Sequence, residues 1–483
     1  MPRQPPRLQV RAGLASVLLL LAGLAPASSA TPEALALAGG TLVDGTGAEP
    51  VPDAVVVVRD GRIACAGRAP ECPVPDGART LDVTGGWITP GLVDAHVHFS
   101  QTGWADGRPD SLDVRERHPY AGVVERLADR PDRFFRSYLC SGVTGVFDVG
   151  GYPWTLDLAE RRRERGDAPR MAATGPLLST LDFWLNLPAE RQFLYLGEPE
   201  DAREAVSYLA ARDADAVKVW FIPTQERPFD ELEAVVQAAG EAARDAGLPL
   251  AVHATGLREA KAALAAGARV LVHGVTDRPV DAELLERARA NGTVYVPTLT
   301  VSRGYLRMYR AALAGREPEL EDPNGCVDPV TRARVAETAE LTSLARSEGL
   351  DPERIEAMER RITRQEELSA ENLRTVNEAG VPVALGTDAG NPLTLPGASV
   401  HAELEAMAAA GLSPGEVLVA ATRGGARAMG AGGETGTVEP GKAADLLVLG
   451  ADPTAGVDAF RELRWVVRAG RLHRPEELSY RVR

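Results

Sequence analysis

The sequence predicts an α/β protein, a (β/α)8 TIM barrel that carries a small β-sandwich built from both ends of the chain. Eight short apolar segments, most of them separated by Ala-, Glu- and Arg-rich stretches with helical spacing, predict the barrel, because strands that alternate with helices form parallel sheets. Short strands and turns at residues 31–88 and again at 434–483 predict the sandwich. The barrel then occupies residues 89–433.

The composition is that of a globular protein. The chain has 483 residues, of which 45% are hydrophobic and 25% charged, with 53 Lys and Arg against 68 Asp and Glu. This composition excludes a disordered, a collagen-like and a disulfide-scaffold protein, and the length suits one large barrel with an accessory domain. Because neutralising phosphates requires a basic surface, the net charge of −15 argues against nucleic acid as a partner.

Residues 1–30 have the layout of a secretory signal peptide. Three arginines and no acidic residue precede the apolar segment Leu14–Leu24, which is too short to span a bilayer stably, and Ser28, Ser29 and Ala30 supply small residues for cleavage. An uncleaved membrane anchor is the alternative. No later segment reaches the ~18 apolar residues that a spanning helix requires. We therefore expect a periplasmic or secreted protein that has no membrane contact after cleavage.

Export makes the four cysteines candidates for disulfides. Cys65 and Cys72 are separated by a turn-rich segment, so a local bridge between them is expected. Cys140 fits a buried small apolar residue better, and Cys326 lies in a predicted loop. Four cysteines allow three pairings, and the sequence does not choose among them.

The strands of the β module are predicted from short segments bounded by turns. They are Leu35–Leu42, Ala54–Arg59 and Arg62–Ala66 near the start, and Gly441–Leu449 and Arg464–Arg468 near the end. Asp44-Gly45 and Asp60-Gly61 favour hairpins. A module built from both ends brings the termini together, whereas two unrelated β appendages are the alternative.

The barrel strands are predicted from apolar, mostly β-branched segments. They are Trp87–His96, Gly142–Val149, Arg170–Ala173, Ala214–Trp220, Pro249–His253, Arg269–His273, Thr293–Leu299 and Val381–Leu385. Phe229–Ala246 and Leu257–Ala266 are two of the helices expected between them. The connection Thr300–Gly380 is mostly helical by pattern and long enough to include a lid.

Chemically able side chains stand where these apolar segments end, which is where barrel enzymes place their active sites. Strand alternation puts His96 and His98 on the same face, so both imidazoles can reach one metal ion. The other side chains at segment ends are Lys218, His253, His273 and Asp388. Any one such histidine would be unremarkable in a core, but four of them with an acid at equivalent ends predict a metal centre.

Lys218 lies inside an otherwise apolar strand. Burial disfavours the charged ammonium, and a neutral lysine can react with carbon dioxide to give a carbamate, an anionic oxygen ligand that can bridge two metals. In that arrangement His96, His98 and Asp388 hold one divalent ion, His253 and His273 hold a second, and carboxylated Lys218 bridges them. The alternative is a neutral lysine that hydrogen-bonds loop carbonyls beside a single metal.

The chain resembles the amidohydrolase superfamily, and most of all its imidazolonepropionase-like and Xaa-Pro dipeptidase-like branch. The resemblance covers nearly the whole mature chain and rests on four segments. They are Thr89-Pro-Gly-Leu-Val-Asp-Ala-His96-Val-His98, Val217-Lys218-Val219, Leu385-Gly-Thr-Asp388-Ala-Gly and Gly441-Lys-Ala-Ala-Asp-Leu-Leu-Val-Leu449. It implies a barrel with a β-sandwich, usually two metal ions, typically zinc, and N6-carboxylated Lys218. One departure is that relatives often follow the lysine strand with a Ser-Gly-Gly-like loop, which here is Phe221-Ile-Pro-Thr-Gln.

The reaction class implied is hydrolysis of a C–N amide or peptide bond in a small molecule, such as an N-acyl amino acid or a dipeptide, Xaa-Pro included. Asp388 would take a proton from the attacking water and pass it to the leaving amine. A ring-opening hydrolase of a cyclic amide, imide or lactone with one metal is one alternative, and a non-catalytic periplasmic binding protein is another. A deaminase fits less well, because no glutamate follows His253 closely; Glu259 lies six positions on.

The substrate residues are less well determined by the sequence. Trp220 ends the lysine strand, Arg303 and Tyr305 follow the seventh strand, and His401 follows the eighth, so each is a candidate for lining the pocket. Arg303 could hold a carboxylate. Ordinary loop packing is the alternative for each, and assembly into a homo-oligomer stays open.

Overall fold

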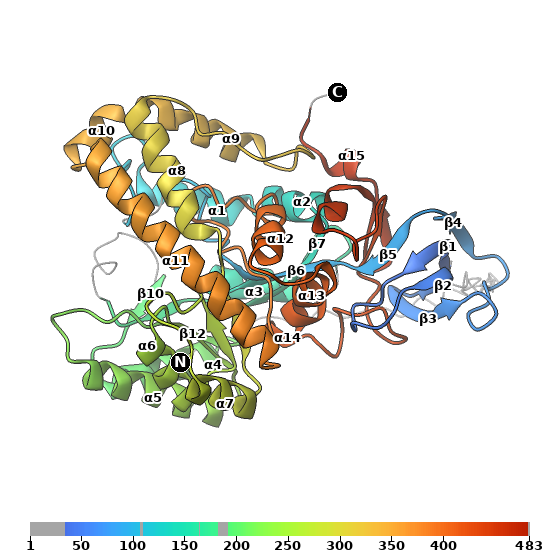
Figure 1. The fold of residues 1–483 in the computed structure, drawn as a ribbon, viewed down its shortest axis with the longest axis horizontal. Helices are drawn as coiled ribbons and strands as arrows, with labels where there is room; N and C mark the ends of the chain where they lie inside the picture. The colour runs from blue at the N-terminus through green and yellow to red at the C-terminus, as the bar shows by residue number, and fades with distance from the viewer. Residues whose placement is uncertain (1–33, 107–109, 164, 182–191, 482–483) are drawn as a thin grey trace, which may run out of the picture.

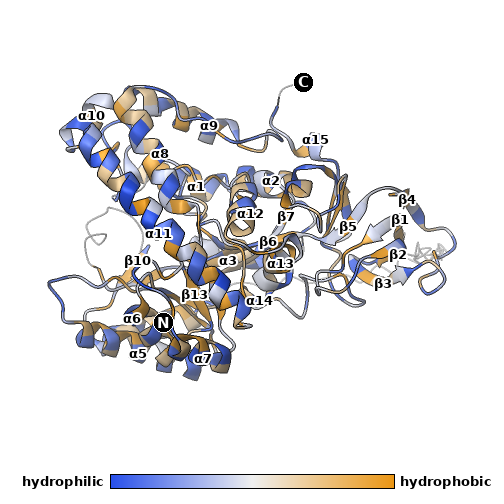
Figure 2. Cartoon of the chain, viewed as in Figure 1, coloured by the Kyte–Doolittle hydropathy of each residue, from blue (hydrophilic) through white to orange (hydrophobic). Residues whose placement is uncertain are grey.

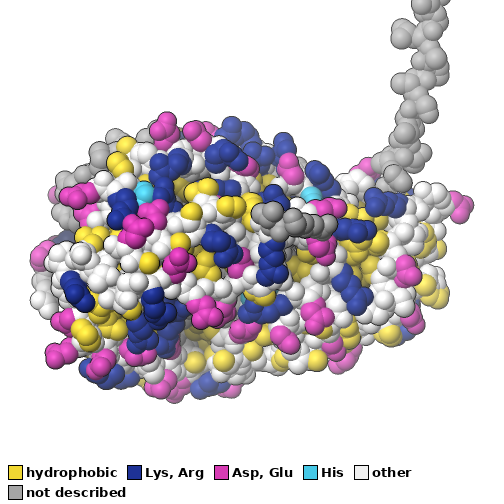
Figure 3. Space-filling model, turned by 90° about the horizontal axis from the view of Figure 1, so that it is seen from above, with side chains coloured by type: hydrophobic (Ala, Val, Ile, Leu, Met, Phe, Trp, Pro, Cys, Tyr) yellow, Lys and Arg dark blue, Asp and Glu magenta, His cyan; other side chains and the backbone are white. Residues whose placement is uncertain are grey.

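The computed structural model describes residues 34–106, 110–163, 165–181 and 192–481. The predicted signal peptide therefore lies outside the described residues. Within the described part, no helix is both long and apolar enough to cross a membrane. A sheet-rich unit lies beside a larger α/β body (Figure 1). Basic and acidic side chains are interspersed on the face shown in Figure 3.

The sheet-rich unit is one eight-stranded sheet made from both ends of the chain. Its strands are β1 (Leu35–Leu42), β2 (Val51–Arg59), β3 (Arg62–Arg68), β4 (Arg79–Asp82), β5 (Trp87–Pro90), β15 (Leu446–Leu449), β16 (Leu463–Arg468) and β17 (Arg471–His473). Their order is β17-β16-β15-β5-β1-β2-β3, with β4 paired to β1. The two ends of the chain meet where β5 pairs antiparallel with β15. These pairings place all the strands in a single sheet, not in two separate ones.

Local sequence explains the turns of this sheet. Asp60-Gly61 joins β2 to β3 with both residues at positive φ, 53° and 73°, which a two-residue hairpin of this kind requires. Asp44-Gly45 does not form such a turn. Instead the Asp44 carboxylate accepts a hydrogen bond of 2.8 Å from the backbone N–H of Thr46 within a longer connection. A disulfide joins Cys65 to Cys72 after β3.

Parallel strands form the centre of the α/β body. One sheet contains β6 (Leu92–Val97), β7 (Val143–Asp148) and β8 (Arg170–Ala173). The second runs β10-β9-β11-β12-β13-β14 and consists of β9 (Leu177–Ser179), β10 (Phe193–Tyr195), β11 (Val217–Trp220), β12 (Leu250–His253), β13 (Val270–Val272) and β14 (Val294–Val296). Nearly every residue of these strands is buried, as expected for parallel strands covered on both faces.

Hydrogen bonds join these two sheets in two places. The backbone N–H of Asp215, at the start of β11, donates to the carbonyl of Ala173 in β8 at 3.0 Å. On the other side, Ala384 N–H donates to Tyr295 O in β14, and Ala95 N–H of β6 donates to Leu385 O, each at 2.9 Å. The predicted eighth strand is therefore bonded on both sides, although only isolated bridges are formed there. The fold is α/β with parallel sheets and a β domain, consistent with a TIM barrel.

The predicted first barrel strand, Trp87–His96, is wrong as one element. It divides at Gly91 into β5, which belongs to the terminal sheet, and β6, which belongs to the body. A Cβ atom at Gly91 would lie 2.0 Å from Oγ1 of Thr144, so only glycine allows this close approach to β7.

Amphipathic helices cover the strands. They are α1 (Tyr120–Asp129), α2 (Asp132–Cys140), α3 (Trp154–Arg162), α4 (Pro199–Ala210), α5 (Phe229–Asp245), α6 (Leu257–Ala265), α7 (Ala282–Asn291), α12 (Val400–Ala409), α13 (Pro414–Val419), α14 (Gly425–Ala428) and α15 (Pro475–Leu478). Hydrophobic and hydrophilic residues alternate along helices such as α5 and α7 in Figure 2. In α5 the buried residues include Leu232, Val235 and Val236, at the spacing of one helix face.

The long connection after β14 is helical, as predicted. It contains α8 (Val301–Ala314), α9 (Pro329–Ala336), α10 (Thr342–Ser347) and α11 (Pro352–Glu378). These helices have a hydrophobic core of their own, which includes Trp104, Leu306 and Ile355. A disulfide between Cys140 of α2 and Cys326 ties this insertion to the body. The expectation that Cys140 is simply a buried apolar residue was therefore wrong, because the topology brings a cysteine from far along the chain against it.

Candidate metal centre and active site

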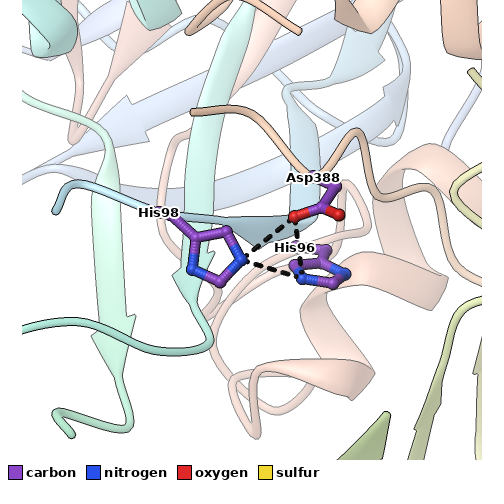
Figure 4. A group of neighbouring side chains, drawn as sticks. All are labelled: His96, His98 and Asp388. Carbon is purple, nitrogen blue, oxygen red and sulfur yellow. Dashed lines mark hydrogen bonds and ion pairs between the residues drawn. The ribbon is translucent and has the colours of Figure 1, made fainter. Parts of the chain in front are cut away.

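His96, His98 and Asp388 converge on one point (Figure 4). The Nε2 atoms of the two histidines lie 3.2 Å apart, and each lies close to Oδ1 of Asp388, at 3.2 Å from His96 and 3.0 Å from His98. All three side chains are buried. Three nitrogen and oxygen donors this close are an arrangement typical of a bound divalent cation.

The backbone brings these three residues together. His96 and His98 lie at the end of β6 and point to the same side, since one residue separates them. The N–H of Asp388 donates to the carbonyl of His96 at 2.8 Å, and Asp388 itself has a φ of 58°. A positive φ is strained for a residue other than glycine, and such strain is often found at functional sites.

Asp94 connects the two segments that supply the group. Its carboxylate accepts hydrogen bonds from the N–H of His96 at 3.2 Å and from the N–H and hydroxyl of Thr387 at 3.0 and 2.6 Å. Burial raises the pKa of Asp94 to about 7, although these hydrogen bonds favour its charged form. Asp94 therefore fixes the relative position of β6 and the segment that carries Asp388.

The donor set fits a metal ion. Nδ1 of His98 lies 2.8 Å from the carbonyl oxygen of Gly150, so Nδ1 carries the proton and Nε2 presents its lone pair to the group. Oδ1 of Asp388 is buried and receives no hydrogen bond within the described structure. The negative charge of a buried carboxylate oxygen that faces two imidazole lone pairs has no hydrogen bond to stabilise it. A bound cation would supply that stabilisation.

Lys218, His253 and His273 lie on the neighbouring strand ends. The ring centroid of His273 is 4.9 Å from that of His96 and 4.3 Å from that of His253. Nδ1 of His273 is 2.7 Å from Oγ1 of Thr298, which leaves its Nε2 free to act as a ligand. His273 also has a positive φ, of 75°. Lys218 is 1% exposed.

Electrostatics keep these residues in the forms that a metal requires. Burial lowers the pKa of His96 and of His253 well below the usual range and that of His273 to about 4, so all three are neutral near pH 7. Burial alone would raise the pKa of Asp388, and only positive charge beside it, on protonated His96 and His98 or on a bound cation in their place, brings that pKa below its usual range. Burial also lowers the pKa of Lys218 to about 8.

One cavity of about 240 Å³ connects the whole constellation. All six predicted ligands line it, together with the predicted substrate residues Trp220 and Tyr305. The remaining lining residues are Gln101, Asp110, Leu177, Phe193, Thr255, Val301, Ser302 and Asn391. The structure thus brings together residues from widely separated parts of the sequence.

The two other predicted substrate residues do not line this cavity. Arg303 is on the opposite side of α8, where its Nε donates to Glu366 of α11 at 3.0 Å, and a second cavity lies beside it. His401 is buried on α12, and burial lowers its pKa to about 3. Neither residue lines the ligand cavity in this structure, because residues that follow a strand in the sequence can lie on either face of the next helix.

Sequence reasoning missed several residues of the site. Asn391 donates from Nδ2 to the carbonyl oxygen of Asp388 at 2.9 Å and accepts from the hydroxyl of Tyr305 at 2.8 Å. Thr298 supports His273, and Gln101 lines the cavity. Asn391 and Gln101 each stand three residues after a ligand, and this closeness was the only signal that could have indicated them.

Comparison with known proteins agrees with this geometry. The Amidohydrolase family matches residues 87–469. The chain is 28% identical over 479 residues to the imidazolonepropionase of Rhizorhabdus wittichii, which covers 91% of this chain and 93% of that protein. A crystal structure of a candidate prolidase from Bifidobacterium longum superposes with a TM-score of 0.67 at 26% identity, covering 94% of this chain and 97% of the other. A Xaa-Pro dipeptidase crystallised with methionine in its active site gives a TM-score of 0.66 at 21% identity, covering 92% of this chain and 100% of the other.

The chain belongs to the amidohydrolase family, since the match covers most of its length. It is therefore an enzyme that hydrolyses carbon–nitrogen bonds, as the sequence motifs predicted. Divalent metal ions are typical of this family, and the group of His96, His98 and Asp388 is suited to hold one.

Proposed function

We propose that this chain is an exported amidohydrolase with two divalent metal ions, zinc by preference, that cleaves the amide or peptide bond of an N-acyl amino acid or a dipeptide, Xaa-Pro dipeptides included. One observation carries the proposal: six side chains with suitable donor atoms, from the ends of different strands, line a single cavity. The signal-peptide layout of residues 1–30 is the support for export to the periplasm or the medium.

The six ligands divide into two groups in this proposal. His96, His98 and Asp388 hold one ion, and His253 and His273 hold the other. Lys218 would be the ligand shared by the two ions, as a carbamate: its neutral amine attacks the carbon of carbon dioxide, an N–C bond forms as one C=O double bond becomes a single bond, and one proton is released. The lowered pKa of Lys218, about 8, supports this step because it makes the neutral amine accessible near physiological pH.

The residues of the chain have separate tasks in the reaction. The metal ions, when bound, supply Lewis acidity and lower the pKa of a bound water. Asp388 is ionised and lies at the centre of the ligand group, so its carboxylate takes a proton from the attacking water and passes it to the leaving nitrogen. Asn391 and Tyr305 hold the backbone at Asp388 in place while this transfer occurs.

A ring-opening hydrolase with one metal is the second candidate function. Two observations favour it. Within the described residues, His96, His98 and Asp388 form the one group of three His, Cys, Asp or Glu donors that lie close together. The imidazolonepropionase of R. wittichii also matches along nearly its whole length. A cyclic amide would then be the substrate, and Lys218 would remain an unmodified amine.

The architecture that positions the site is part of the proposal. We infer a closed (β/α)8 barrel over residues 89–433, in which the segment Val381–Leu385 occupies the position of the eighth strand. The hydrogen bonds that join the two parallel sheets in two places support closure. Residues 31–88 and 434–483 form the β domain, and the pairing of β5 with β15 supports its composite origin.

Metal analysis combined with a substrate screen tests the proposed function. The mature enzyme is loaded with zinc, its metal content is measured, and it is incubated with N-acyl amino acids, dipeptides that end in proline, and cyclic amides. We expect about two zinc ions per chain and hydrolysis of linear amides. One zinc ion with cleavage of cyclic amides alone would establish the second candidate instead.

A further inference from the structure

Two walls of the active-site cavity differ in their chemistry. Leu177, Phe193 and Trp220, from the strands β9, β10 and β11, line one side of it. They form a small apolar cluster of their own, in which the ring centroids of Phe193 and Trp220 lie 5.8 Å apart. Leu177 and Phe193 are only 5% and 8% exposed, so this apolar wall is firmly packed.

The apolar wall begins beside the second group of ligands. The ring of Trp220 meets that of His253 edge to face, with centroids 6.1 Å apart. In the observed strand pairings β11 is followed by β12, β13, β14 and then the segment that ends at Asp388. The apolar wall and Asp388 therefore belong to opposite sides of the strand assembly.

The wall on the side of Asp388 is polar. It contains Gln101, Asp110, Ser302, Tyr305 and Asn391, with Val301 of α8 as an apolar member, and the hydroxyl of Tyr305 donates to the Asp110 carboxylate at 3.2 Å. Tyr305 and Asn391 are linked to Asp388 by the hydrogen bonds described above. A group bound here meets amide, hydroxyl and carboxylate groups, whereas a group bound at the apolar wall does not.

We propose that the substrate lies across the metal centre with an apolar acyl group, aromatic or branched aliphatic, against Leu177, Phe193 and Trp220, and with a polar amine half on the side of Gln101, Tyr305 and Asn391. This inference rests on the proposed function, because it uses the role of Asp388. Asp388 delivers a proton to the leaving nitrogen, so the leaving amine lies on its side of the cavity. The acyl substituent then extends to the other side, where burial of apolar surface favours it.

Two matched substrate series test this orientation in the zinc-loaded enzyme. The acyl series consists of N-acetyl-, N-isovaleryl- and N-phenylacetyl-L-serine. The amine series consists of N-acetyl-L-serine, N-acetyl-L-leucine and N-acetyl-L-phenylalanine. We expect kcat/KM to rise about tenfold or more along the acyl series, since burial of one large apolar side chain has at least this effect on affinity, and to change less along the amine series.

Substitutions in the apolar wall test whether it causes the preference for large acyl groups. Trp220→Ala should lower kcat/KM about tenfold more for the phenylacetyl substrate than for the acetyl substrate, and Trp220→Phe should restore the wild-type ratio between the two. If Trp220→Ala fails to fold, Phe193→Leu is the smaller substitution, and it should also lower kcat/KM for the phenylacetyl substrate more than for the acetyl substrate. Tyr208→Ala is the matched control, because this α4 ring packs with Arg212 and lies outside the cavity lining. It should alter neither series.

Binding of the acid products gives a readout independent of turnover. Calorimetry should show phenylacetate binding about tenfold more tightly than acetate to the zinc-loaded wild-type protein, with the difference lost in Trp220→Ala. Hydrolysis with a flat acyl series and a steep amine series would overturn this inference and leave the proposed function intact. No hydrolysis of any N-acyl amino acid or dipeptide by the two-zinc enzyme would overturn both.

Discussion

The six donor side chains form two unequal groups. In the first, ligand atoms of His96, His98 and Asp388 already lie 3.0 to 3.2 Å apart. In the second, His253 and His273 have ring centroids 4.3 Å apart, and Lys218 supplies an amine that is not a metal ligand until it is modified. The first group is thus assembled by folding alone, whereas the second needs a chemical step.

The difference has a cause in the backbone. The first group lies where two chain segments are directly hydrogen-bonded, between Asp388 and His96, and where the Asp94 carboxylate bridges both segments. The residues of the second group stand on the tips of three adjacent strands, where His273 is held by Thr298. We infer that the first group binds its metal more tightly than the second.

The largest effect is expected from Asp388→Asn. This change removes the proton acceptor and donor but keeps an oxygen ligand, so kcat should fall by about a thousandfold or more while much of the metal is retained. Turnover and zinc content are measured on the same preparation. Activity within tenfold of wild type would exclude Asp388 as the acid–base residue.

A pair of substitutions compares the two groups directly. His98→Ala should lose the tightly bound zinc on dialysis, whereas His253→Ala should keep about one zinc ion per chain, and both should lose at least about a hundredfold in activity. Elemental analysis after dialysis against a weak chelator gives the stoichiometries. Equal retention of metal by the two variants would show that the groups do not differ in affinity.

Activation of the metal-free enzyme should depend on pH through Lys218. With a pKa of about 8, its amine is mostly protonated at pH 7 and mostly neutral at pH 9. Only the neutral amine reacts with carbon dioxide, so reactivation by zinc at the same concentration of dissolved carbon dioxide, with bicarbonate adjusted to each pH, should be several-fold faster at pH 9 than at pH 7. Lys218→Ala is the control and should show no bicarbonate effect. Reactivation that is independent of bicarbonate in the wild-type enzyme would contradict carboxylation.

The smallest expected effect is on the free energy of unfolding and comes from Glu403 of α12. Its carboxylate accepts hydrogen bonds from the N–H groups of Leu299 and Thr300, which follow Thr298. Burial raises its pKa to about 7, above the ordinary 4.5. The folded protein therefore binds this proton more tightly than the unfolded chain, and the stabilisation is present at low pH and is lost as the pH rises from 4.5 through 7.

Glu403→Gln should weaken that pH dependence. Each unit of pKa shift corresponds to about 1.4 kcal/mol, so the difference between wild type and variant is a few kcal/mol at most. Urea denaturation at pH 5, 6, 7 and 8 measures it. A wild-type free energy of unfolding that rises between pH 5 and 7 relative to the variant would contradict the assigned direction.

Much of the parallel-strand body was predictable because each buried strand leaves a run of apolar residues. The segment Arg170–Ala173 was predicted at its observed bounds, and the positions of His253 and Asp388 at strand ends followed from the same pattern. Strand alternation was also enough to pair His96 with His98. In these cases the secondary structure and the side that a residue faces depend on its immediate neighbours in the chain, so the sequence pattern was enough to predict them.

Other features were not predictable for a physical reason. Gly91 interrupts one apolar run because a Cβ atom would collide with Thr144, and that contact exists only in the folded protein. Arg303 points away from the cavity because it pairs with Glu366, which lies far along the sequence. The disulfide of Cys140 with Cys326 also depends on tertiary contact.

The shared sheet has a consequence for biosynthesis. Until Leu446–Leu449 pairs with it, the strand Trp87–Pro90 has no partner on one edge, and an open edge favours association with other chains. A chain that ends before Leu446 contains every proposed catalytic side chain but leaves the backbone hydrogen-bonding groups of Trp87–Pro90 unpaired on one edge. Pairing of Leu446–Leu449 with Trp87–Pro90 therefore removes this open edge, and the chain can no longer associate with other chains there.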